Sequence, residues 1–500
     1  MSAVARLRAH ERLSLVLSSL VTACTVALPD PRPCVANEDC RDEFGGGSRC
    51  LPSGYCAAAT LPPRCTRSYP EDLVDDPSRY QERTILATLY SFTDHLDSLR
   101  ASELAVRLVD ARTDARADAE EPRFAMLHCD TTPFAGDALG DLDAIEQLAP
   151  FLVRELGVPV LVGARGSART EAAFRALDTG EAVIVSPSAT SPQLTLLEPF
   201  VPTDDAPGFL WRTVPPDSLQ SAVMAADVLG RGRTRAAILY QTGAYGDALA
   251  TLFAARVSEA GGVISSFPFD PGNDFSVTIA TVGERIAAGD VDEVVFISSD
   301  IGDYIDFFVG ASASASLSAQ YASLAESGEG GIFLADTAYS PRLLTEVGGA
   351  ADRLFAAVRG TRPAPAEGVV FNAFAAAYST HYGEDATASA YTSHSYDAAW
   401  LAIYGVAWAH AQDGVVTSLG VARGLRRLAS GPAFDVVPDT WPEILAAFRS
   451  GQSVNLRGAS GLLDYDPATE ELASPVELWR ITETTPGTYG FVRIDLVDPR

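Results

Sequence analysis

Short, continuous apolar runs take turns with amphipathic stretches along most of the chain. The runs in its first half are "RTILATLYSF" from Arg83, "RFAMLHCD" from Arg123, "VPVLVGA" from Val158 and "EAVIVSP" from Glu181. Between them, "SELAVRLVDAR", "DLDAIEQLAPFLVREL" and "ARTEAAFRAL" place apolar residues at helical spacing. Strands this apolar, each followed by a helix, predict a parallel sheet that is covered on both faces.

A second set of the same kind follows the segment "FLWRTVPPD". Its strand-like runs are "RAAILYQT" from Arg235, "GVISSFPF" from Gly262, "VDEVVFISS" from Val291 and "GGIFLADTAYS" from Gly330. The later stretch "ASAYTSHSYDAAWLAIYGVAWAHA" is helical in pattern but has no sheet of its own. We expect it to pack on the first α/β unit. A length of 500 residues with 47% apolar content supports two such units.

The charge of the chain narrows the classes of partner. It has 37 Lys and Arg against 65 Asp and Glu, a formal net charge of −28. Such a surface repels phosphate backbones and anionic membrane surfaces. Nucleic acid is therefore not an expected partner.

The amino terminus has the pattern of a secretory signal. Three arginines, Arg6, Arg8 and Arg12, precede the apolar stretch "LSLVLSSLV", which is too short to span a bilayer. The ending "LVTAC" resembles the lipobox of bacterial lipoproteins, in which the cysteine, here Cys24, is lipidated and becomes the first mature residue. We expect residues 1–24 to be a lipoprotein signal peptide, so that the membrane contact is made through a lipid anchor. The alternative is an ordinary cleaved signal with an incidental cysteine.

Six further cysteines fit an oxidising compartment. Four of them, Cys34, Cys40, Cys50 and Cys56, are separated by five, nine and five residues, which predicts a small two-disulfide knot of any of three connectivities. Zinc binding is the alternative, although no CxxC pair is present. The remaining two, Cys65 and Cys129, are expected to pair with each other. Residues 25–80, rich in Pro, Gly, Asp and Cys, are expected to form a disulfide-rich spacer.

The sequence carries none of the common catalytic motifs. The chain lacks a GxSxG elbow, a GxxxxGK[ST] phosphate loop and an HExxH helix, and its six histidines show no metal-ligand spacing. We therefore expect no enzyme activity, no cofactor and no metal site.

Several pieces, taken in order, resemble the leucine/isoleucine/valine-binding family, the amino acid receptors of ABC importers that share the type I periplasmic-binding-protein fold. They include "GVPVLVGARGSARTEAAF", "VIVSPSATSPQLT", "FLWRTVPPDSLQSAVMA", "RAAILYQTGAYGDALATLF" and "LRGASGLLDYD". The resemblance implies an α/β protein of two doubly wound parallel-sheet lobes, joined by crossing strands, that close over a small ligand. The expected first lobe is 81–215 plus 363–455, and the second is 216–362 plus 456–500.

Hydroxyl-rich turns in the first lobe are the expected ligand contacts. In parallel sheets, ligands bind beyond the carboxyl ends of strands, where free N–H groups of helices point at them. The turn "VGARGS" places Ser167 there, and "SPSATSP" does the same for Ser188, Ala189 and Thr190. These groups suit the ammonium and carboxylate of an amino acid. The alternative is that Ser167, Thr190 or Ser191 caps its own helix.

The second lobe contributes three further candidates. Tyr245, in "TGAYGDAL", follows a strand and can cover a ligand or simply pack. Asp336, in "GGIFLADTAYS", matches the family position that often supplies an acid to the ligand's ammonium; the alternative is a solvated loop carboxylate. Asp300 lies at a comparable strand edge. Arg165 departs from the family pattern, so the ligand could bear an extra negative charge or the arginine could face solvent.

Two functions from different classes follow. The first is a lipid-anchored extracytoplasmic solute-binding protein that delivers a small amino-acid-like ligand to an ABC permease. The second is a non-transport sensor or regulatory protein of the envelope, with the same fold and a binding partner on its knot or outer surface. The knot favours the second, because a simple import receptor does not need one.

Overall fold

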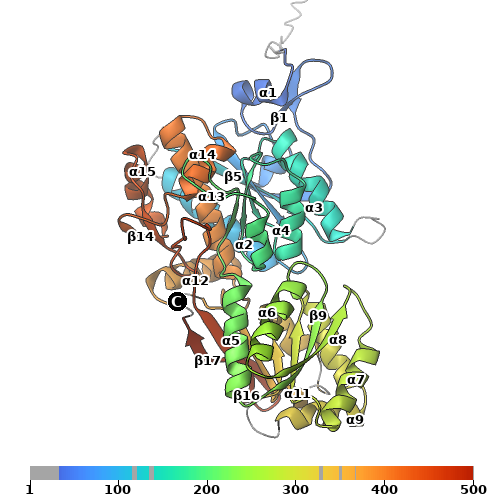
Figure 1. The fold of residues 1–500 in the computed structure, drawn as a ribbon. Helices are drawn as coiled ribbons and strands as arrows, with labels where there is room; N and C mark the ends of the chain where they lie inside the picture. The colour runs from blue at the N-terminus through green and yellow to red at the C-terminus, as the bar shows by residue number, and fades with distance from the viewer. Residues whose placement is uncertain are drawn as a thin grey trace, which may run out of the picture.

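Two α/β lobes are stacked end to end in this computed structural model, with a small disulfide-bonded module at the far end of the first lobe (Figure 1). The structure describes residues 33–114, 121–133, 140–325, 330–347, 349, 352–365 and 367–498. The predicted signal peptide and the predicted lipidation site, Cys24, lie outside these residues. No helix in the described part of the chain is long and apolar enough to cross a bilayer.

The first lobe is built on a six-stranded sheet in the order β3-β5-β4-β6-β7-β8. All neighbours in it are parallel except β3, which runs antiparallel to β5. Its strands are β3 (Cys65–Tyr69), β4 (Arg83–Tyr90), β5 (Arg123–Asp130), β6 (Val160–Gly163), β7 (Val183–Ser186) and β8 (Leu210–Arg212).

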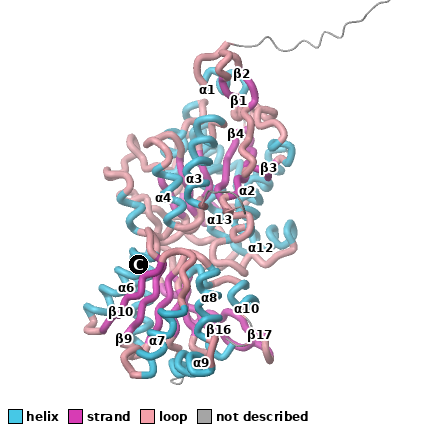
Figure 2. The backbone as a smooth tube through the Cα atoms, turned by 90° about the vertical axis from the view of Figure 1, so that its right-hand side faces the viewer, coloured by secondary structure: helices cyan, strands magenta, loops and turns pink. Residues whose placement is uncertain are grey.

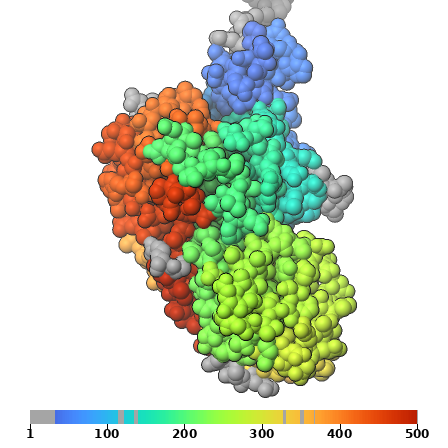
Figure 3. Space-filling model, in the orientation of Figure 1, coloured from blue at the N-terminus to red at the C-terminus, as the bar shows by residue number. Residues whose placement is uncertain are grey.

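Helices cover both faces of this sheet, as the alternation of strands and helices predicts. One face packs against α3 (Asp141–Pro150), the π-helix η2 (Phe151–Glu155) and α4 (Ser167–Arg175). The other face packs against α2 (Leu96–Asp114), α12 (Val369–Tyr382), α13 (Thr392–Asp413), α14 (Ser418–Leu425) and α15 (Trp441–Arg449). The Ala-rich stretch is therefore the central helix α13 of the first lobe, which explains why its pattern is apolar on nearly all sides. Figure 3 shows that segments from the early and the late parts of the sequence pack together in the first lobe.

The second lobe has a seven-stranded sheet in the order β10-β9-β11-β12-β13-β16-β17. Its parallel strands are β9 (Arg235–Gln241), β10 (Val263–Phe269), β11 (Glu293–Ile297), β12 (Ile332–Leu334) and β13 (Val358–Pro363). An antiparallel hairpin, β16 (Val476–Thr485) and β17 (Thr488–Val497), completes one edge. One face packs on α5 (Asp217–Gly230) and α6 (Gly246–Glu259). The other packs on α7 (Ser276–Ala287), α8 (Ile301–Ala311), α9 (Ala315–Ala322), α10 (Pro341–Glu346) and α11 (Asp352–Phe355).

The chain passes three times between the lobes, as a two-lobed fold with crossing strands requires. The crossings follow β8, follow β13 and precede β16. The last two are hydrogen-bonded, because the Ala364 N–H donates to the Pro475 carbonyl at 3.0 Å. Figure 2 shows strands β9 and β10 of the second lobe running up toward this junction.

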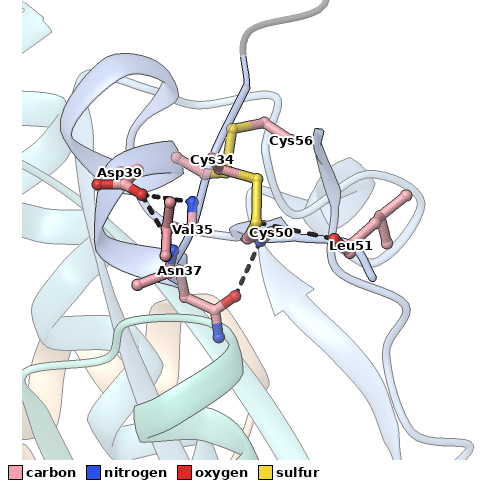
Figure 4. Close-up of a disulfide and its surroundings, with 9 residues drawn as sticks. Cys34, Val35, Asn37, Asp39, Cys50, Leu51 and Cys56 are labelled. Carbon is pink, nitrogen blue, oxygen red and sulfur yellow. Dashed lines mark hydrogen bonds between the residues drawn. A yellow bond between two sulfur atoms is a disulfide. The ribbon is translucent and has the colours of Figure 1, made fainter. Parts of the chain in front are cut away.

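The four closely spaced cysteines form the predicted two-disulfide knot. The pairs are Cys34–Cys50 and Cys40–Cys56, so the sulfur atoms that the zinc alternative needed are used in disulfides. The knot contains α1 (Asn37–Phe44), β1 (Ser48–Cys50) and β2 (Cys56–Ala58). Figure 4 shows the Asn37 side chain accepting a hydrogen bond from the Cys50 N–H, at 2.8 Å.

The knot is seated on the end of η2. Asn37 Nδ2 donates to the Arg154 carbonyl at 2.9 Å, and the Gly47 N–H donates to the Leu156 carbonyl at 2.9 Å. The remaining predicted pair, Cys65–Cys129, is also formed and joins β3 to β5. The spacer expected over 25–80 is thus shorter, because residues from Cys65 onward already belong to the sheet of the first lobe.

The second lobe also begins its last segment later than expected. Strand β15 (Asn455–Arg457) pairs with β14 (Ala433–Asp435), and the side chains of Leu463, Tyr465 and Leu472 pack into the core of the first lobe. The chain re-enters the second lobe at Val476 rather than at residue 456. These apolar side chains are too widely spaced to reveal, from sequence, which lobe they join.

Candidate functional site

A cavity of about 390 Å³ lies between the two lobes, at the carboxyl ends of their parallel strands. Residues from both lobes line it, which is the arrangement expected of a ligand site in a two-lobed α/β protein. The first lobe contributes Asp94, His95, Asp97, Arg165, Gly166, Ser167, Arg169, Ser188, Tyr378, Glu384, Asp385, Ala388, Ser389, Tyr391 and Thr392. The second lobe contributes Tyr245, Ser299, Asp300, Ile301, Asp336, Thr337, Ser340, Pro341 and Arg342.

Asp336 belongs to the second lobe's wall and lies two residues after the end of β12. Its carboxylate is 1% exposed and accepts hydrogen bonds from two tyrosines, Tyr245 on one oxygen and Tyr391 on the other. Burial raises the pKa of Asp336, and the two hydroxyl donors partly offset that rise. The predicted pair Tyr245 and Asp336 is thus brought together, and Asp336 is a buried acid rather than a solvated loop carboxylate.

Asp217, the first residue of α5, is a second buried acid beside Asp336. It is fully buried, and its backbone N–H donates to the Thr190 carbonyl at 2.8 Å. The Thr190 hydroxyl stands against the carboxylate, but neither oxygen of Asp217 makes a well-formed hydrogen bond with the described residues. Burial raises the pKa of Asp217 well above its ordinary value, and the neighbouring Asp336 carboxylate raises it further. Of these two acids, Asp336 lines the cavity and Asp217 does not.

The opposite wall is formed by the start of α4 and the loop after β7. Ser167 is the first residue of α4, and its hydroxyl accepts a hydrogen bond from the Ser191 N–H at 3.1 Å. The Ser188 hydroxyl accepts one from the Gly166 N–H at 2.8 Å. Both predicted serines line the cavity while they hold the two loops together, so neither is a simple helix cap. Ser191 does cap the short helix η3 (Pro192–Leu196), by accepting a hydrogen bond from the Gln193 N–H at 3.4 Å.

Two predicted contacts lie behind this wall. Ala189 and Thr190 are fully buried and do not line the cavity. The Ala189 carbonyl accepts a hydrogen bond from the Arg212 guanidinium at 3.3 Å, while Thr190 faces Asp217. Their position makes them supports for the loop and for the buried acid in the present arrangement of the lobes.

Arg165 lines the cavity, and its side chain is largely buried rather than turned to solvent. Its guanidinium pairs with Asp97 at 3.2 Å and lies over the Tyr391 ring, 4.8 Å from the ring centre. The adjacent His95 is buried, and its pKa is lowered well below the ordinary value by burial and by the charges of Arg165 and Arg169. His95 is therefore neutral at physiological pH and contributes a polar ring rather than a charge to the cavity wall.

The predicted Asp300 lies at the rim of the cavity as the N-cap of α8. Its Oδ1 accepts a hydrogen bond from the Gly302 N–H at 2.8 Å, and its side chain is exposed. Asp385 of the first lobe also lines the cavity, and it accepts a hydrogen bond from the Thr387 N–H at 2.8 Å. Arg342 of the second lobe forms an ion pair with Asp94 of the first at 2.9 Å, so one ionic contact joins the two lobes beside the cavity.

Sequence reasoning missed Tyr391, which lines the cavity, and Asp217, which is buried next to Asp336. Asp217 stands in the quoted crossing "FLWRTVPPD", where a Pro-Pro-Asp sequence before a helix signals an N-terminal acid, but its burial beside Asp336 has no local signal. Tyr391 precedes α13, and its contact with Asp336 depends on how the lobes are stacked.

Comparisons with known proteins agree with this architecture. A family model described as periplasmic binding protein matches residues 132–438. The leucine binding protein LivK from Thermotoga maritima is similar over 83% of this chain and 99% of its own, with 17% identity and a TM-score of 0.59.

Two ligand-bound structures are also similar in fold. A solute binding protein of R. palustris in complex with 4-hydroxybenzoate covers 83% of this chain and 97% of its own, with 13% identity and a TM-score of 0.59. LivJ from Streptococcus pneumoniae, in complex with isoleucine, covers 82% and 99%, with 16% identity and a TM-score of 0.53. No curated protein matches the chain in sequence.

Proposed function

The chain belongs to the periplasmic binding protein family, and from this membership we propose that it is an extracytoplasmic receptor that closes its two lobes on a small, amino-acid-like ligand. The family is one of solute-binding proteins, and we propose binding without covalent chemistry. The candidate ligand contacts are Ser167, Ser188, Tyr245, Asp300 and Asp336. Ala189 and Thr190 are proposed to join them when the lobes close.

The buried acid Asp336, which lines the cavity, carries the proposal, and the charge of the buried Asp217 adds to it. A buried carboxylate without an opposite charge beside it lowers the stability of the free protein, and a ligand ammonium placed there would offset that loss. Solved relatives bind either isoleucine, which has an ammonium group, or 4-hydroxybenzoate, which has none. A buried acid in the cavity wall favours a ligand of the first kind.

The start of α4 offers a binding site for the carboxylate of such a ligand. The N–H groups of a helix's first turn and its dipole attract anions, and Ser167 and Ser188 add hydroxyls on the same wall. An amino acid that spans the cavity would thus place its carboxylate toward the first lobe and its ammonium toward the second.

Delivery to an ABC permease and anchoring through Cys24 complete the proposal. The "LVTAC" sequence supports the anchor. Labelling of cells with a radioactive fatty acid should mark the wild-type protein and not Cys24→Ser, which should be released in soluble form. An unlabelled wild-type protein would rule the anchor out.

Binding itself is tested by thermal shift and calorimetry with a panel of amino acids. A ligand at a hundredfold excess over its dissociation constant should add about 2.7 kcal/mol to the free energy of unfolding. Aromatic acids without an amine form the control panel. Binding of the control panel alone would reject the ammonium site, and no shift with either panel would reject the receptor function.

The position of the knot favours one alternative, an envelope sensor or regulatory protein. The disulfide-bonded module lies at the end of the first lobe opposite the second lobe, so it can contact another protein without covering the cleft (Figure 1). Deletion of a cognate permease gene would separate the two functions, since a sensor should still produce its cellular response.

A further inference from the structure

We propose that the second lobe has a binding site for a phosphate group, in a notch at the end of its sheet that faces away from the cleft. The site lies outside the cleft of the proposed function and does not depend on it. Its ligand would be inorganic phosphate or the phosphate group of a small soluble ester.

The notch is a cavity of about 410 Å³ that results from the unequal lengths of two neighbouring strands. Strand β13 pairs with β16 only as far as Arg480, which lies opposite Arg359, the second residue of β13. From Ile481 onward, β16 pairs with β17 alone and extends past β13. The cavity lies beside this extension, and Arg353 of α11 lines it from the other side.

The notch and the cleft lie at opposite ends of the second lobe. The carboxyl ends of the parallel strands face the cleft, whereas the notch is beside the amino end of β13. Figure 1 shows α11, which carries Arg353, at the end of the lobe away from the first lobe. A ligand in the notch would therefore leave the cleft open.

The charge of the notch is opposite to that of the rest of the chain. Its charged lining consists of three arginines and one acid: Arg353, Arg359, Arg480 and Glu483. The cleft, by contrast, is lined by three arginines and six acids, and the whole chain has 37 Lys and Arg against 65 Asp and Glu. A cavity with an excess of cations in so acidic a chain favours an anionic ligand.

Two of the three arginines are available to such a ligand. Arg359 is already paired with Asp227 of α5, from Nε at 3.1 Å and from Nη2 at 2.5 Å. Within the described part of the chain, Arg353 and Arg480 form no ion pair and donate no side-chain hydrogen bond. Both side chains are exposed, so a small ion can reach them. Oε1 of Glu483 instead accepts a hydrogen bond from the Gly487 N–H at 2.7 Å.

The pairing of β13 and β16 places two of these positive charges side by side. Arg359 and Arg480 are directly opposite each other in an antiparallel pair, so their side chains project from the same face of the sheet. Like charges in this position repel each other, and Asp227 pairs with Arg359 only. An anion between the two guanidinium groups would relieve the repulsion and accept charge-assisted hydrogen bonds as well.

A phosphate group matches these donors better than a carboxylate. A guanidinium group is a planar fork that binds two oxygens, and a phosphate has enough oxygens for two forks. Two unpaired arginines also match the charge of a phosphate monoester, which is −1.5 to −2 near pH 7. The net charge of −28 repels anionic membranes, so a small soluble ion is favoured over a lipid headgroup.

Calorimetry on the purified full-length protein, with inorganic phosphate in a chloride buffer, tests the proposal. Wild type should bind phosphate saturably, and the double variant Arg353→Gln with Arg480→Gln should bind it at least about tenfold more weakly, because charge-assisted hydrogen bonds are lost. Arg449→Gln is the matched control and should bind as wild type does. It alters an exposed arginine of α15 that forms no ion pair with the described residues. No saturable binding by wild type, or equal binding by the double variant, would overturn the site.

Thermal unfolding separates a lost site from a lost fold. In phosphate-free buffer, Arg480→Gln should unfold at the wild-type temperature or slightly above it, because the substitution removes the repulsion from Arg359. Added phosphate should then raise the unfolding temperature of wild type more than that of the double variant. An equal rise in both proteins would mean that phosphate acts on the whole protein rather than in the notch.

Two further ligands test the class and the source of the anion. Acetate should bind much more weakly than phosphate, and equal binding of the two would overturn the assignment to phosphate. Vesicles that contain phosphatidic acid should not sediment the protein, and arginine-dependent sedimentation would overturn the soluble source. The double variant should bind the amino acid panel as wild type does, so the outcome at the notch is independent of the outcome at the cleft.

Discussion

Tyr391 of the first lobe donates a hydrogen bond from its phenolic hydroxyl to Asp336 of the second, so this contact joins the two walls of the cavity. Tyr245 holds the other oxygen of the same carboxylate from the second lobe. Asp336 therefore couples the position of the lobes to the electrostatics of the site. A ligand ammonium that reaches this acid would meet two tyrosines already in place around it.

The first prediction concerns this acid. Asp336→Asn keeps the size of the side chain and removes its charge, so an ammonium-bearing ligand should bind more weakly by about 2–5 kcal/mol. Calorimetry with the tightest amino acid of the panel measures the loss. Asp306→Asn serves as the control, since that residue is exposed on α8. Equal affinities for Asp336→Asn and wild type would place the ammonium elsewhere.

The second prediction concerns the strap of residues 458–474 that leads back to the second lobe. Asp397, fully buried on α13, accepts hydrogen bonds from the N–H groups of Ala459 at 2.9 Å and Ser460 at 2.6 Å. A Cβ atom added at Gly458 would collide with the Asp397 carboxylate. Gly458→Ala should therefore lower the free energy of unfolding by about 1–3 kcal/mol, as overpacking does.

Gly230→Ala is the matched control for this substitution. Gly230 ends α5 and has open space around it, so alanine there should be neutral or stabilising by up to about 1 kcal/mol. Urea unfolding of both variants measures the difference. Similar destabilisation by the two alanines would mean that the Asp397 contact does not hold the strap.

Much of this architecture could be predicted from local patterns, and the rest depends on contacts that no local pattern records. The spacing of apolar residues predicts the strands and helices of both sheets. The Ser-Pro pair predicts that Ser191 caps a helix, because a cap depends only on residues close in sequence. The lobe to which residues 458–474 belong depends on packing of scattered side chains such as Tyr465 against Trp211. Similarly, Tyr391 follows Asp336 by 55 residues, and only the stacking of the lobes joins them.

The third prediction concerns the disulfide between Cys65 and Cys129. Replacing both cysteines with serine opens a loop closed over a sequence separation of 64, which should lower the free energy of unfolding by about 4 kcal/mol under oxidising conditions. Urea unfolding measures the loss.

The double variant Cys40→Ser with Cys56→Ser is the comparison for this loss, because it removes a disulfide of the knot that closes a sequence separation of only 16. The knot rests on η2 at the opposite end of the first lobe from the cleft, so the affinity for a bound amino acid should not change. A loss of ligand affinity in this knot variant would show that the module communicates with the cleft.

The fourth prediction is that Asp217→Asn stabilises the free protein and weakens ligand binding. In the folded protein, burial and the charge of Asp336 raise the pKa of Asp217. The wild-type protein therefore becomes more stable as the pH falls through this raised pKa and Asp217 takes up a proton. Asparagine does not titrate, so the variant lacks this gain. The variant should be more stable by about 1–3 kcal/mol at pH 7, with the difference shrinking toward the ordinary aspartate pKa of about 3.9. Thermal unfolding of both proteins from pH 8 to pH 4 measures this, and calorimetry should show weaker binding of an ammonium-bearing ligand. A difference in stability that does not change with pH would mean that folding does not raise the pKa of Asp217.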